Sequence, residues 1–146
     1  MALKSTGLAT YLAVTGSLKA ALDTGYLYIF SGPVPATADA AIDPSCVQLV
    51  KLTDNGDGTT GLTFSGTATG GVLTKTPSEV WEGVVAASGT ATFWRFCPSS
   101  DTPANASTTA ARLQGTVGTT IASDMVLTTN VLTAANTQTM SLFQVD

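Results

Sequence analysis

The stretch GYLYIFSGPVPATADAAIDPS, Gly25 to Ser45, is the most informative part of the sequence. It begins with a run of large apolar side chains, Tyr26 to Phe30, of types that are enriched in β-strands, and the run stops at Ser31-Gly32-Pro33. Alternate residues of a strand share a face, and both faces of this run are apolar. We therefore expect the strand to be covered on both sides, either within its own domain or by a neighbouring subunit.

The residues that follow the run, Pro33 to Ala41, have little to bury and no chemically reactive group. Pro-Val-Pro is pre-set to an extended conformation, which lowers the entropy that the segment loses when it docks. The small side chains from Ala36 onward can lie flat against another surface. We interpret Pro33 to Ala41 as an arm that contacts a neighbouring molecule, and a loop that wraps its own domain is the open alternative.

Most of the remaining chain alternates β-branched and aromatic runs with turn residues, which predicts strands. The stretch EVWEGVVAASGTATFWRFC further predicts a hairpin with Ser88-Gly89 as its turn. About nine strands at this spacing are typical of an antiparallel β-sandwich of jelly-roll type or a related barrel. The expected strands are Tyr26–Phe30, Cys46–Thr53, Thr60–Phe64, Gly71–Lys75, Val80–Ala87, Thr90–Cys97, Arg112–Val117, Met125–Leu132 and Thr137–Val145.

The first residues follow a different pattern, because apolar side chains recur there at intervals of three to four from Leu8 to Leu22. This period predicts one or two short helices, with a break at Thr15-Gly16-Ser17 and Ser17 as an N-cap. We expect one domain overall, made of a helical segment at 1–24 and a β-sandwich at 25–146. Seven aromatic residues should form its core: Tyr28, Phe30, Phe64, Trp81, Trp94, Phe96 and Phe143.

Composition limits the classes of partner. The 146 residues carry a formal charge of −4, and their six Lys and Arg residues are scattered, which argues against nucleic acid as a partner. No apolar stretch is long enough for a signal peptide or a membrane span, so we expect no membrane contact. Only 11% of residues are charged, against roughly 25% in typical soluble domains, which suggests that other chains cover part of the surface.

Residues that could carry out chemistry are few. The chain has no His, and Cys46 and Cys97 are predicted to be reduced and inert. Glu79 and Glu82 would point to opposite faces of a strand, which argues against a paired-carboxylate site. The stretch DNGDGT, from Asp54, has turn spacing and lacks the ligand spacing of an EF-hand. We predict no catalytic, cofactor-binding or metal-ligating residue.

The order of motifs resembles that of small phage and prophage structural proteins. LYIFSGPVPATADAAID is similar to their strand followed by a G-x-x-P-A-T-A-D arm, LTFSGTATGGVLT resembles their Gly/Ala stretch, and GTATFWRFC resembles their G-T-A-x-W-F-R strand. The resemblance covers most of the chain from Leu18 to Val145. It implies a virion-associated protein without catalytic residues, of the capsid decoration or cement type.

The expected function is therefore non-enzymatic. A homo-oligomer made in the host cytoplasm would bind the outer surface of the phage head and bridge subunits of the major capsid protein. Alternatives are a tail or neck component, or a virion module that binds host glycans or another host surface. The residues expected to make intermolecular contacts lie in the arm and near the N-terminus: Leu3, Leu8, Pro33, Val34, Pro35 and Ala36.

Overall fold

A computed structural model describes residues 1–145. Its two helices, α1 (Thr6–Val14) and α2 (Leu18–Leu22), begin at serine N-caps. The Ser5 hydroxyl accepts the backbone N–H of Leu8 and the Ser17 hydroxyl accepts that of Ala20, which satisfies donors that a helix start leaves free. The predicted helices, their break and the Ser17 cap are confirmed.

The protein is mainly β. The main sheet has eight strands in the order β1-β8-β7-β2-β3-β5-β11, with β9 also paired to β8, and two small sheets pair β10 with β6 and β12 with β4. All these pairings are antiparallel except β8 with β9. The strands are β1 (Leu3–Lys4), β2 (Tyr26–Ser31), β3 (Val47–Asp54), β4 (Leu73–Thr74), β5 (Trp81–Val84), β6 (Gly89–Thr90), β7 (Phe93–Cys97), β8 (Leu113–Gly118), β9 (Met125–Val126), β10 (Val131–Leu132), β11 (Thr137–Met140) and β12 (Gln144–Val145).

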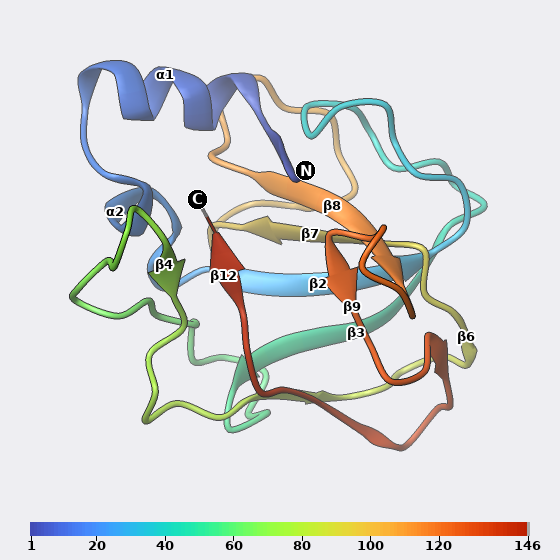
Figure 1. The fold of residues 1–146 in the computed structure, drawn as a ribbon. Helices are drawn as coiled ribbons and strands as arrows, with labels where there is room; N and C mark the ends of the chain where they lie inside the picture. The colour runs from blue at the N-terminus through green and yellow to red at the C-terminus, as the bar shows by residue number, and fades with distance from the viewer. Residues whose placement is uncertain (146) are drawn as a thin grey trace.

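Figure 1 shows the main sheet crossing the molecule, with β12 and β9 in front of it and α1 above. The larger core lies on this side, which we call the groove-side face. Phe64, Trp81, Phe96 and Phe143 form an aromatic cluster there, with ring centroids between 5.4 and 6.2 Å apart. Leu8 and Leu22 join the same core, so apolar packing fixes both helices to the sheet.

The opposite side of the main sheet, which we call the arm-side face, holds a second cluster made of Tyr28, Phe30, Phe93 and Cys97. Ile42 and Cys46 pack against it from the segment that follows β2. The loops 32–46 and 98–111 therefore cover a face that the sequence required to be buried. All seven predicted core aromatics are buried, in one cluster or the other.

Several local predictions were wrong. β5 does not pair with β7, so the hairpin around Ser88-Gly89 does not form; β5 lies between β3 and β11. Residues 60–64 make isolated bridges at Leu62 and Phe64 in place of a strand. The expected strand Met125–Leu132 is divided into β9 and β10, which belong to different sheets. Pairing depends on distant partners, which a local pattern does not specify.

Candidate contact surfaces

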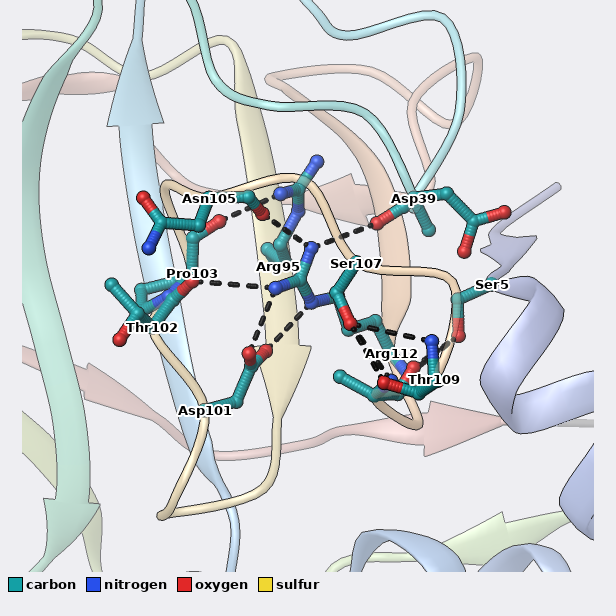
Figure 2. Close-up of polar contacts among 12 residues, drawn as sticks. Ser5, Asp39, Arg95, Asp101, Thr102, Pro103, Asn105, Ser107, Thr109 and Arg112 are labelled. Carbon is teal, nitrogen blue, oxygen red and sulfur yellow. Dashed lines mark hydrogen bonds and ion pairs between the residues drawn. The ribbon is translucent and has the colours of Figure 1, made fainter.

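Two arginines lie fully buried on the arm-side face. Arg95 is in the middle of β7, between Phe93 and Cys97, and Arg112 comes directly before β8. A buried guanidinium is costly unless acceptors surround its donors. Here the acceptors come from the two loops that cover this face (Figure 2).

Arg112 binds the loop 98–111 more extensively. Its Nε and Nη2 donate to the two carboxylate oxygens of Asp101, at 2.6 and 2.8 Å, in a bidentate ion pair. Nη1 donates to the carbonyl of Asn105 at 2.8 Å and to that of Ala38 at 3.4 Å. Because Ala38 belongs to the arm, this one side chain holds both loops.

Arg95 connects the same two loops without a carboxylate. Its Nη1 donates to the carbonyls of Ala40 at 3.1 Å and Pro103 at 2.7 Å, while Nε donates to Oε1 of Gln114 at 3.1 Å. The Gln114 amide in turn donates to the carbonyl of Pro35 at 2.8 Å. Burial, and then repulsion by Arg112, lower the pKa of Arg95 to about 10, so the guanidinium stays charged at neutral pH.

Backbone contacts complete the attachment of the arm. The N–H of Ile42 donates to the carbonyl of Ala104 and the N–H of Ser107 to that of Asp39, both at 2.9 Å. The Asp39 carboxylate accepts the backbone N–H of Thr6 at 2.9 Å and its hydroxyl at 2.6 Å, at the first turn of α1. The arm therefore joins the sheet, the loop 98–111 and the helix within one chain.

The arm was interpreted as a segment that contacts a neighbour. Within this single chain it wraps its own domain, which was the open alternative. Pro33, Val34 and Ala36 keep exposed side chains, whereas Pro35 is half-buried. Leu3 is exposed on β1, at one end of the main sheet. Leu8 is a correction: it is buried in the groove-side core, because Ser5 caps α1 and turns that face of the helix inward.

A groove of about 760 Å³ opens on the other side of the molecule. Trp94, Leu113 and Phe143 contribute apolar surface, and two charged side chains, Lys4 and Asp124, also line it. The strands at the two ends of the main sheet contribute as well, β1 with β9 from one end and β11 from the other. The remaining lining residues are Met1, Ala2, Met125, Val126, Leu127, Thr128, Gln138, Thr139, Met140, Ser141, Leu142, Gln144 and Val145.

The titratable groups that sequence reasoning considered have structural roles. Glu79 accepts the indole N–H of Trp81 at 2.7 Å and the backbone N–H of Thr63 at 2.9 Å, while Glu82 faces Thr139 across the sheet. Both cysteines are free, and burial raises the pKa of Cys97 to about 12, so its thiol is protonated at neutral pH. Among residues 1–145 no group of three or more His, Cys, Asp or Glu side chains could hold a metal ion.

The DNGDGT stretch forms the predicted turn. Asn55, Gly56 and Gly58 all have positive φ, and the N–H of Asp54 donates to the carbonyl of Thr60 at 3.0 Å. The Asp57 carboxylate accepts the hydroxyl and N–H of Thr60 and the N–H of Thr59, and these hydrogen bonds lower its pKa. The acidic residues thus stabilise the loop itself.

Sequence reasoning missed the roles of Arg95, Arg112 and Gln114. One signal was present, since Arg95 lies in a strand that is otherwise apolar, where a charged side chain needs buried partners. Nothing in the sequence identified those partners, because most of them are backbone carbonyls of two loops.

The chain matches no protein-family model, no curated protein and no solved structure. No helix within residues 1–145 is both long enough and apolar enough to cross a membrane.

Proposed function

We propose that this protein is a non-enzymatic phage virion protein that decorates the outer surface of the head and bridges subunits of the major capsid protein. The observation that carries the proposal is the number of exposed aliphatic side chains on a chain with few charged residues. Five aliphatic side chains from Val84 onward are at least half exposed, on a chain with only 11% charged residues: Val84, Ile121, Val126, Val131 and Leu142. Covering these side chains with another protein would remove apolar surface from water, which favours binding.

The internal attachment of the arm supports a role as a rigid spacer. Each buried arginine is satisfied by its own chain, so neither is available for a substrate or a phosphate. A body fixed in this way loses little conformational entropy when it docks. Many weak contacts repeated over a shell would then retain it through avidity.

The sites of contact differ from those first expected. Leu3 and the exposed side chains of Pro33, Val34 and Ala36 remain candidates, while Leu8 does not. The sandwich of jelly-roll type is also part of the proposal. In such a fold the curved main sheet would turn over on itself, and the shared groove between its two ends is consistent with that curvature.

Deletion of the gene tests the assignment. We expect virions that lack this protein to have intact tails and heads that open more readily on heating or at low salt, with normal heads restored by adding purified protein. A homo-oligomer in the host cytoplasm before assembly is part of the proposal. If the protein purified with tails and never with heads, the assignment to the head would be wrong and the tail or neck alternative would be favoured. Loss of adsorption with unchanged head stability would favour the host-surface alternative.

A further inference from the structure

We propose that the groove between the two ends of the main sheet receives an extended peptide segment of a partner protein, and that this segment carries apolar side chains and a carboxylate. The inference rests on the proposed function only for the identity of the partner as a head protein.

Strands from the two ends of the main sheet line the groove. Within residues 1–145, β1 and β9 pair only with β8, and β11 pairs only with β5. Each of these strands therefore has a second edge without a strand partner. An extended segment can satisfy such an edge by adding a strand, and its alternate side chains then face the floor.

The groove also contains a buried hydrogen-bond donor without an acceptor. Trp94 is 2% exposed, and its indole Nε1 is the one buried side-chain nitrogen or oxygen that finds no partner within residues 1–145. Trp81, the other tryptophan, donates to Glu79 at 2.7 Å. The Trp94 indole packs over Gly115, where an added Cβ would lie 2.7 Å from Nε1. Because Nε1 is covered, an incoming strand would contact the Trp94 side chain, and a carbonyl would reach its N–H only after a shift of the side chains around it.

Charge favours an acidic segment. Asp124 is already occupied, since one carboxylate oxygen accepts the backbone N–H and the hydroxyl of Thr116 and the other pairs with the Met1 amino group. The Lys4 side chain is exposed and makes no ion pair or hydrogen bond with any residue from 1 to 145. A carboxylate on the segment would complement this cation. A symmetric contact between two copies would instead tend to bring Lys4 toward Lys4.

The exposed rim residues fit the same occupant. Val126 and Leu142, which line the groove, are 50% and 63% exposed. A strand seated between them would bury both, and removing such apolar surface from water favours binding.

A defined peptide tests the groove without reference to heads. The probe is an acetylated, amidated hexapeptide that alternates Val and Thr and carries one Glu, and the control peptide has Lys in place of Glu. The two indole N–H resonances of the protein are followed by ¹⁵N NMR and assigned with a Trp94→Phe variant. We expect a saturable shift of Trp94 with Trp81 unmoved, weakened severalfold by Lys4→Ala and absent with the control peptide. An unmoved Trp94 resonance, or equal shifts of both indoles, would overturn the proposal.

Photo-crosslinking separates this inference from the proposed function. In the test variant, a benzophenone amino acid replaces Leu142 at the rim. In the matched control it replaces Ile121, which is 97% exposed and does not line the groove. We expect crosslinks from position 142 to an extended acidic segment of a head protein. If the protein binds heads fully but gives no such crosslinks, the groove is not the peptide site and the proposed function is unaffected. Crosslinks only to a second copy overturn the choice of partner. Failure to bind heads overturns the function, and the peptide experiment then decides the groove.

Discussion

The groove-side face of the main sheet is covered by apolar packing, whereas the arm-side face is covered by two loops whose carbonyl groups are bound by buried arginines. Leu8, Leu22 and the aromatic cluster close the first face mainly by apolar packing, with one indole hydrogen bond from Trp81 to Glu79. On the second face, Arg95 and Arg112 bind both loops. Apolar packing is non-directional, while a guanidinium requires acceptors at fixed positions. The same sheet thus has one face that tolerates repacking and one that depends on individual contacts.

The largest expected effect is on the groove-side face. Trp81→Ala removes a fully buried indole and leaves Glu79 without its indole donor, so we expect a loss of about 3–5 kcal/mol in the free energy of unfolding. Denaturant unfolding measures it. The control Val84→Ala lies on the same strand with an exposed side chain, and should change stability by no more than about 0.5 kcal/mol. Equal effects of the two variants would contradict the assigned core.

On the arm-side face, the strongest single effect should come from Arg112→Met. Breaking a buried ion pair typically costs about 3–5 kcal/mol, and we expect about 2–4 kcal/mol because Asp101 keeps 11% of its side chain exposed. Unfolding in denaturant tests this. The double variant Arg112→Met with Asp101→Asn should recover part of the loss, since it removes the unpaired carboxylate. No recovery would show that the ion pair is not the main contribution.

A smaller effect is expected at Gln114, which connects Arg95 to the arm at Pro35. Gln114→Ala removes the acceptor of the charged Arg95 guanidinium and the donor to the Pro35 carbonyl but removes no charge, so the expected loss is about 1–3 kcal/mol. Gln138→Ala is the control, because its amide donates only to the adjacent Thr139 carbonyl. Attachment of the arm to its own sheet predicts a larger loss at Gln114 than at Gln138, and the reverse order would count against that attachment.

The last effect concerns pH and is absent at neutral pH. Burial raises the pKa of Cys97 from 9.0 to about 12, so below pH 9 the thiol is neutral in both the folded and the unfolded protein. Above that pH the unfolded state ionises first, and stability is lost as pH rises toward about 12. Melting temperatures across this window should fall less steeply in Cys97→Ala. Burial also raises the pKa of Tyr28, so some alkaline loss should remain. An unchanged slope in the variant would refute the assignment to Cys97.

The comparison of the two faces explains how much the sequence could predict. Periodicity identified the helices, the buried aromatics and the double burial of β2, since these depend on local patterns. It could not identify what covers the arm-side face. Pro33 to Ala41 contributes backbone carbonyls, at Pro35, Ala38 and Ala40, and a backbone carbonyl is the same at every residue type.

Strand pairing was the other limit. The Ser88-Gly89 turn signal is real as a local pattern, but Gly89 and Thr90 pair with Leu132 and Val131 in a small separate sheet. β5 pairs with β3 and β11, which are distant from it in the sequence. Trp81 of β5 pairs with Asp54 of β3, more than 25 residues away, and with Met140 of β11, which is further still. Lys4 and Trp94 become neighbours in one groove by the same long-range pairing, so sequence alone could not join them.

The central claim is that the arm is fixed to its own sheet within one chain. Amide hydrogen exchange of the isolated protein tests it most directly, through the N–H groups of Ile42 and Ser107, which donate to Ala104 and Asp39. We predict that both exchange far more slowly than unstructured amides, and that Gln114→Ala speeds up Ile42 while the central strands β2 and β7 stay protected. If Ile42 and Ser107 exchanged at the rate of an unfolded chain while β2 and β7 stayed protected, the account would be contradicted. The arm would then be free to contact a neighbouring molecule, as the sequence first indicated.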